Sequence, residues 1–150
     1  MEPFDMSRFE FVRFKSLEKW GVIMKAADSL AACKGITAAD LADKPLIFPR
    51  RFREDADLRN WFGEYYDKLH IFSTSNLPTN AAMLVDKGLG YAITIEGVKY
   101  FWDTAKVVFR PLEPVVGETA ALFWLRQMPL SPSVEKFIAF AKCFLSMPKH

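Results

Sequence analysis

The stretch ITAADLADKPLIFP, residues 36–49, contains the change from helix to strand that decides the fold class. Thr37 stands three residues before Asp40, which is the spacing of a capping box at the start of a helix. We predict that Pro45 ends this helix, because proline has no amide hydrogen for the helical ladder. Residues 46–48 are all apolar and lie between two prolines, which indicates a short buried strand.

Amphipathic helices and short apolar strands alternate along the rest of the chain. The clearest helix has a single apolar face, with residues at helical spacing: Leu58, Trp61, Phe62, Tyr65, Tyr66 and Leu69. We predict further helices over 38–43, 79–87 and 132–146, and a short helical turn over 96–102. Strands or apolar runs are predicted at 8–14, 20–24, 70–74, 89–95, 106–112 and 120–126. This alternation indicates an α/β domain in which helices cover a largely parallel sheet.

The composition fits one folded domain and excludes several classes of protein. With 150 residues, 51% of them hydrophobic and 15% aromatic, the chain is neither disordered nor too short for a sizeable core. The net charge of +2 gives no basic arm for nucleic acid. Charged residues or prolines interrupt every apolar run far short of ~18 residues, so we expect no membrane span. Only two cysteines and no signal peptide indicate the cytoplasm.

The residues show no catalytic or metal-binding motif. The two histidines and two cysteines are isolated, which disfavours a zinc site. The pair Gly88 and Gly90 lacks a third glycine and follows a helix, so it is not a dinucleotide-binding motif. We therefore expect no enzyme, no cofactor and no metal. An enzyme remains the alternative only if Cys33, His70 or Cys143 meets a partner in the tertiary structure.

Two loops are candidates for binding a small molecule. Pro49, Arg50, Arg51 and Phe52 follow a predicted strand, and ligands of open α/β sheets bind outside the carboxyl ends of strands. Arginines there can hold an anion through paired hydrogen bonds, although a solvated charge cluster is an equal alternative. The loop 73–80 is rich in hydroxyl and amide side chains before a helix, where anions bind. Ordinary turn chemistry is the alternative for this second loop.

Several segments resemble one family of bacterial regulators. The run at 36–47 is similar to the "I-T-x-x-D-L-x-x-x-P-L-I" segment of LysR-type transcriptional regulators, and 80–93 resembles their "V-x-x-G-L-G-I-A" unit. The segment 20–31 is similar to their strand before a "D-x-P-L-A" turn, here shortened and without the proline. Three later features complete the pattern, which covers nearly all of 18–146: residues 109–114, the Phe123-Trp124 strand and the Ser131-Pro132 helix start.

The resemblance implies a ligand-sensing domain of the type II periplasmic-binding-protein-like fold. The chain would be one partial effector-binding domain, with 16–105 as the second subdomain and 106–150 as the C-terminal segment that returns to the first. By position, a small, anionic effector such as a carboxylate would contact Pro49, Arg50, Arg51, Phe52, Ser75, Asn76 and Asn80. DNA would be bound only through a domain outside this chain.

The predicted C-terminal segments are strongly apolar and, by the resemblance, pack on a first subdomain that this chain does not contain. We therefore expect a homo-oligomer rather than a monomer. A stand-alone small-molecule-binding or dimerisation module without a transcriptional role remains the alternative to the regulator.

Overall fold

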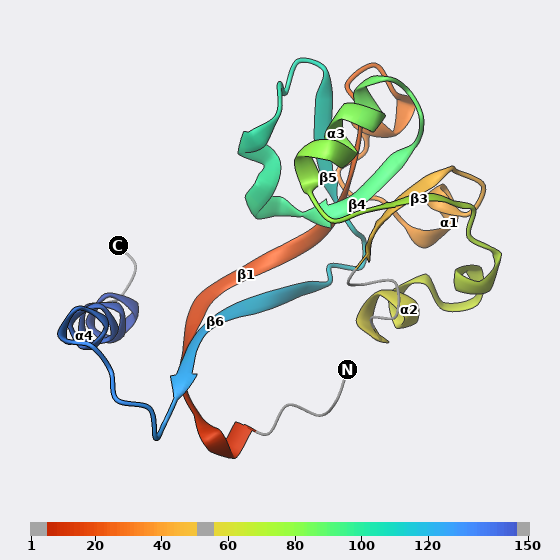
Figure 1. The fold of residues 1–150 in the computed structure, drawn as a ribbon. Coiled ribbons are helices and arrows are strands. Elements are labelled where there is room, and N and C mark those ends of the chain that lie inside the picture. Colours follow the sequence, from red (N-terminus) through yellow and green to blue (C-terminus); the bar gives the residue numbers. More distant parts are fainter. Residues whose placement is uncertain (1–5, 51–55, 147–150) are drawn as a thin grey trace. The chain divides into compact units, whose positions relative to one another are not determined.

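Figure 1 shows a computed structural model of the protein, which describes residues 6–50 and 56–146. The chain forms two compact units. The larger unit comprises Glu18–Glu118, and the smaller unit comprises Met1–Leu17 together with Thr119–His150. In the described parts of the chain, no helix has the length and hydropathy that crossing a membrane requires.

The larger unit contains a mixed sheet with the strand order β3-β2-β4-β1-β5. Strand β2 pairs in parallel with both β3 and β4, whereas β1 pairs antiparallel with β4 and β5. Four of these strands therefore run in one direction, and β1 lies among them in the opposite direction. The expectation of a largely parallel sheet is thus correct for four strands and wrong for β1. The strands are β1 (Phe9–Lys25), β2 (Leu46–Pro49), β3 (Ile71–Ser75), β4 (Tyr91–Ile95) and β5 (Val107–Pro111).

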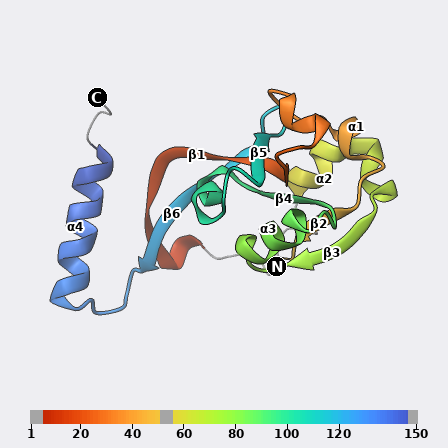
Figure 2. The same ribbon diagram turned by 90° about the horizontal axis from the view of Figure 1, so that it is seen from above.

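Helices cover both faces of this sheet (Figure 2). On one face, α3 (Pro78–Asp86) buries Ala81, Ala82 and Val85 against alternate strand residues, among them Ile23 and Ile47. On the other face, α1 (Ala38–Leu41), α2 (Ala56–Phe62) and the short 3-10 helix η2 (Ser29–Ala32) pack on a larger cluster. The largest fully buried side chains of that cluster are Trp20, Met24, Phe48, Phe62, Ile36, Leu41, Leu46, Leu58 and Leu112. Because successive side chains of a strand point to opposite faces of the sheet, an apolar core forms on each face.

Local signals place the start of α1 and the end of α3 as predicted, whereas α1 ends at Leu41, before the predicted residue 43. The Thr37 side chain accepts from the Asp40 amide while the Asp40 side chain accepts from the Thr37 amide, so the capping box is present. Gly88, at φ 75°, follows α3, and its amide donates to the carbonyl of Val85. The amide of Leu89 donates to the Leu84 carbonyl, which completes a Schellman motif.

The prediction of one long helix through Leu69 is wrong in its length. α2 ends at Phe62, and the chain continues as the 3-10 helix η4 (Gly63–Lys68). The cause is Gly63, whose φ of 53° lies in the left-handed region and interrupts the α-helical ladder. The predicted helical turn is confirmed as the 3-10 helix η5 (Glu96–Phe101).

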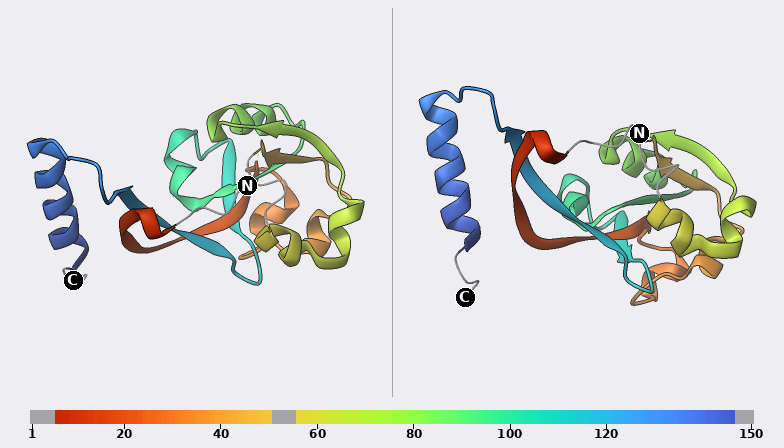
Figure 3. Two further views of the ribbon diagram at one scale, coloured as in Figure 1. Left: turned by 60° about the horizontal axis from the view of Figure 1, so that its bottom comes forward. Right: turned by 90° about the horizontal axis from the view of Figure 1, so that it is seen from below.

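The smaller unit combines the first part of β1, strand β6 (Gly117–Leu125) and helix α4 (Pro132–Ser146). β6 lies beside β1 (Figures 1 and 3), and the Arg126 amide donates to the carbonyl of Arg8 over 2.9 Å. Apart from Arg8, the two apolar runs predicted at 8–14 and 20–24 belong to this one 17-residue strand, β1. A 3-10 helix, η1 (Met6–Arg8), precedes it.

Candidate ligand-binding site

The carboxyl ends of three strands meet at one edge of the larger unit's sheet. Because β3, β2 and β4 are neighbours that run in the same direction, their last residues Ser75, Pro49 and Ile95 lie at the same edge. A pocket of about 670 Å³ opens there, and we name it the strand-end pocket. Its lining residues are Trp20, Ile47, Phe48, Pro49, Arg50, Ser75, Asn76, Leu77, Pro78, Ala81, Ile93, Thr94, Ile95, Val98 and Glu118.

The walls of the strand-end pocket are mainly apolar, and strand pairing sets them. Trp20 lies opposite Ile95 in the β1–β4 register, which brings the buried indole to the pocket from a strand far away in sequence. Its Nε1 donates a hydrogen bond of 3.1 Å to Glu118 Oε1. The pocket volume and the apolar lining suit a small organic molecule.

Polar groups approach the strand-end pocket from the two loops. Arg50 is exposed, and within residues 6–50 and 56–146 no carboxylate forms an ion pair with it. Asn76 is exposed as well and supplies an amide group that can donate and accept. Glu118 places a carboxylate in the same wall. The described lining therefore holds one cationic and one anionic side chain.

The loop before α3 supplies backbone amides more than hydroxyl groups. The Ser75 hydroxyl donates to the carbonyl of Leu77 over 2.8 Å and accepts from the Leu77 amide over 3.3 Å. This bonding matches ordinary turn chemistry, so the hydroxyl shapes the loop. Among the described residues no side chain caps the start of α3, and Pro78 is its first residue. Thr79 and Asn80 follow, and amides in the first turn of a helix have no partner inside the helix, so they can donate to a polar ligand.

The structure brings four of the predicted site residues together and separates one from them. Pro49, Arg50, Ser75 and Asn76 all line the strand-end pocket. Asn80 is exposed on α3 and is not among the lining residues. Arg51 and Phe52, also predicted, lie outside the described residues.

Sequence reasoning missed several residues of the pocket wall. Trp20, Glu118 and Thr94 line the pocket, and Thr94 is only 5% exposed. A tryptophan in an apolar run gives no sign of the pocket it will face, because that depends on which strand pairs with it. The only usable signal was that Thr94 and Ile95 end a predicted strand, which places them at the same edge as Pro49.

The three residues considered for an enzyme, Cys33, His70 and Cys143, do not meet in this pocket. Cys33 and His70 are not among its lining residues, and Cys143 belongs to α4 of the smaller unit. The described residues contain no group of three or more His, Cys, Asp or Glu side chains suited to a metal. The arrangement offers binding groups around an apolar cavity.

Solved structures share this fold at low sequence identity. HinK, a LysR family transcriptional regulator from Pseudomonas aeruginosa, is 18% identical with a TM-score of 0.70, over 97% of this chain and 50% of that chain. The effector binding domain of QuiR, solved in complex with shikimate, is 20% identical with a TM-score of 0.75, over 95% of this chain and 68% of that one. The regulatory domain of CcmR from Synechocystis PCC6803, solved with 2-PG, is 16% identical with a TM-score of 0.70, over 99% of this chain and 73% of that one.

The chain spans about half the length of HinK and of a second LysR family regulator from Pseudomonas aeruginosa, at 50% and 51% of their chains. No curated protein sequence matches it. One family model, the LysR substrate binding domain, matches residues 1–146. That match covers nearly the whole chain and agrees with the mixed sheet and its helices, so this protein belongs to the LysR substrate binding domain family.

Proposed function

We propose that the strand-end pocket binds the small-molecule effector of a LysR-type transcriptional regulator. The observation that carries this proposal is the meeting of Arg50, Asn76 and the uncapped start of α3 around one apolar cavity. Each of these groups comes from a loop that follows a strand of the same sheet edge. QuiR and CcmR, which share the fold, were solved with shikimate and 2-PG.

We propose a small organic anion as the effector. The guanidinium of Arg50 offers a fork of N–H groups that matches a carboxylate, and the first amides of α3 also favour negative charge. The apolar lining fits the remaining part of the ligand. Glu118 lies in the same wall, so a ligand that also carries a hydroxyl group can donate a hydrogen bond to this carboxylate.

The proposed effector site comprises Pro49, Arg50, Arg51, Phe52, Ser75 and Asn76, whereas Asn80, on α3, does not line the pocket. We propose that residues 16–105 correspond to the second of two subdomains and 106–150 to the segment that returns to the first. The DNA-binding domain of the regulator would lie outside these 150 residues, and the regulator would act in the cytoplasm without enzymatic activity. Membership of the family, and the share of the regulators' length that the chain spans, support these proposals.

A thermal-shift screen of small carboxylates, followed by calorimetry, tests the proposal. We expect Arg50→Ala to weaken binding of the best carboxylate about tenfold, which corresponds to about 1.4 kcal/mol. Arg59→Ala is the matched control, since Arg59 is exposed in the same unit and does not line the pocket. Stronger binding of neutral analogues, or equal loss in both variants, would show that the pocket does not recognise anions through Arg50.

The alternative is a dimerisation module, and the smaller unit favours it as a second role. Its exposed large apolar side chains include Phe123, Phe137, Phe140 and Phe144, each more than half exposed. Such surface is normally covered by a partner. A second copy of this chain is the partner that we propose.

A further inference from the structure

A second pocket lies along the last strand of the sheet path. It has a volume of about 590 Å³, and none of its described lining residues also lines the strand-end pocket. We name it the β5 pocket, because four of its residues belong to β5. Its lining residues are Lys19, Ala32, Cys33, Lys34, Glu96, Lys99, Thr104, Val108, Phe109, Arg110 and Pro111.

The charge of the β5 pocket differs from that of the strand-end pocket. Its described lining contains four cationic side chains and one carboxylate, which gives a net charge of +3. The described lining of the strand-end pocket is balanced, with Arg50 against Glu118. The cations of the β5 pocket come from β1, β5, η5 and the turn after η2, and all of these elements belong to the larger unit. A concave surface of one sign raises the local concentration of oppositely charged molecules.

Arg110 is held in a fixed position. Its Nε and Nη2 groups donate to the carbonyl of Ala31, and its Nη1 group donates to the carbonyl of Phe109 over 2.8 Å. These bonds use three of its five N–H groups, which leaves two without a partner among the described residues. An arginine oriented in this way loses little side-chain entropy when an anion binds.

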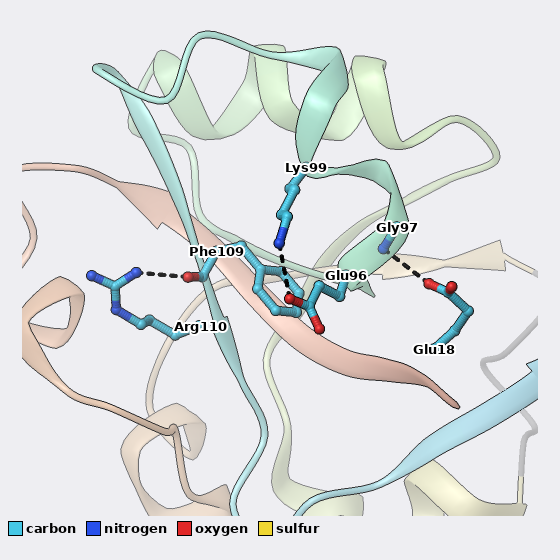
Figure 4. Close-up of polar contacts among 6 residues, drawn as sticks. All are labelled: Glu18, Glu96, Gly97, Lys99, Phe109 and Arg110. Atoms are coloured by element: carbon cyan, nitrogen blue, oxygen red, sulfur yellow. Dashed lines mark hydrogen bonds and ion pairs between the residues drawn. The ribbon is translucent and has the colours of Figure 1, made fainter. Parts of the chain in front are cut away.

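The lysines of the β5 pocket are available to a ligand to different degrees. Lys19 and Lys34 are exposed, and no carboxylate in the described part of the chain forms an ion pair with either. Lys99 forms an ion pair of 2.9 Å with Glu96 (Figure 4). The Glu96 hydrogen bond raises the pKa of Lys99, which keeps this lysine charged. The nearby Glu18 carboxylate accepts from the Gly97 amide over 3.1 Å (Figure 4).

The Phe109 ring provides apolar surface on the side of β5 that faces Glu96 and Lys99, whereas the Arg110 guanidinium extends to the other side of the strand (Figure 4). Phe109 precedes Arg110 on β5 (Figure 4), and its ring packs closely against Gly21 of the neighbouring strand β1. A Cβ atom added to Gly21 would lie only 2.2 Å from the Phe109 ring. Val108, Pro111 and Ala32 add further apolar surface. A site with cationic groups around apolar surface suits an organic anion with a carbon body better than a bare inorganic ion.

We propose that the β5 pocket is a second binding site, separate from the effector pocket, for a small organic anion with two or more negative charges. Lys19, Lys34 and Arg110 bind its charged groups, and Phe109 contacts its carbon body. The helical turn η5 borders both sites, since Val98 lines the strand-end pocket and Lys99 lines the β5 pocket. The proposal does not depend on the identity of the effector.

The two exposed cysteines provide a direct test on the intact chain. Cys33 lines the β5 pocket, whereas Cys143 lies on α4 in the smaller unit and serves as an internal control. Citrate and glycerol 3-phosphate are titrated at constant ionic strength, and alkylation of each cysteine by iodoacetamide is followed by mass spectrometry. We expect at least one of the two anions to slow the alkylation of Cys33 and to leave Cys143 unchanged.

Charge variants then identify the site. Lys19→Gln combined with Lys34→Gln should weaken the protection of Cys33 about tenfold, because two charge-assisted contacts are lost. Lys68→Gln combined with Lys87→Gln removes the same charge from exposed positions outside both pockets and should have no effect. Arg50→Ala should also have no effect, which separates this test from that of the effector site. Protection by neither anion, equal protection of both cysteines or equal loss in both lysine pairs would overturn the proposal.

Discussion

Trp20 donates its indole N–H to the Glu118 carboxylate over 3.1 Å, although 98 positions separate the two residues in the sequence. The bond joins β1 to β6 at the wall of the strand-end pocket. Trp20 is only 2% exposed, so this polar group of the indole is satisfied inside the protein. The same contact therefore supports both the packing of the larger unit and the chemistry of its pocket.

Replacing Trp20 with phenylalanine should lower the free energy of unfolding by about 2 kcal/mol. The substitution removes a hydrogen bond to a charged group and leaves space in a packed core. Urea denaturation followed by circular dichroism measures the change. Glu118→Gln is the matched variant, because it keeps an oxygen that accepts the bond, and it should cost less. Equal losses in the two variants would contradict this expectation.

Gly21→Ala should destabilise the larger unit by about 1 to 3 kcal/mol. The new Cβ atom would lie 2.2 Å from the Phe109 ring and 2.4 Å from the carbonyl oxygen of Arg110, and the backbone atom cannot move without disturbing the β1–β5 pairing. Gly63→Ala provides the comparison. Its Cβ would meet nothing within 4 Å, so only its φ of 53° opposes the substitution, at a cost of about 1 kcal/mol. A larger loss at Gly63 than at Gly21 would contradict this account.

Tyr91 should titrate far above an ordinary tyrosine. Three effects raise the pKa of Tyr91 from 10.0 to about 12. The largest is burial of the side chain, the next is the hydrogen bond from its hydroxyl to Asp28, and the last is the charge of Asp28. Since the folded-state pKa lies above the unfolded value, the stabilisation is complete below about pH 10 and is lost as the pH rises through about 12. The absorbance at 295 nm, compared between the chain and Tyr91→Phe, isolates this titration. A difference curve with its midpoint near pH 10.0 would refute the prediction.

Thr37→Ala should cost about 1 kcal/mol of stability through loss of the helix cap. The Thr37 hydroxyl donates to Asp40 Oδ2 over 2.6 Å, and the Thr37 amide donates to the same oxygen. Both bonds lower the pKa of the Asp40 carboxyl below 3.8, and the bond from the hydroxyl has the larger effect. This stabilisation is present above pH 3.8 and disappears as the pH falls through the folded-state pKa. Carbon-detected NMR titration should show a higher Asp40 pKa in Thr37→Ala, with Thr37→Ser close to the parent chain.

The chain should self-associate through the apolar surface of α4. Phe137, Phe140 and Phe144 are 57%, 66% and 62% exposed. Light scattering over a dilution series should give an average mass above the 17.2 kDa of one chain. Phe140→Ser combined with Phe144→Ser should lower that mass, whereas Met83→Ser, at an exposed position of the larger unit, should not. A constant mass of one chain at all concentrations would exclude the association.

The sequence by itself determined the local elements of this protein. Thr37 and Asp40 specify the start of α1, and Gly88 specifies the end of α3, because each signal depends on backbone groups only three or four residues away. The order of helices and strands, and with it the placement of Pro49 and Ser75 at strand ends, follows from the same kind of short-range pattern. Gly63 shows the limit: the apolar spacing continues across it, but its left-handed backbone does not allow the α-helix to continue.

Only the tertiary structure decided how these elements meet. The reversed direction of β1 between β4 and β5, the contact of Trp20 with Glu118, and the gathering of Lys19, Lys34, Lys99 and Arg110 around one pocket have no local signal. Each depends on hydrogen bonding and packing between segments that are distant in the chain. Strand register is fixed by how whole apolar faces fit together, so the neighbours of a given side chain are known only once the sheet has formed.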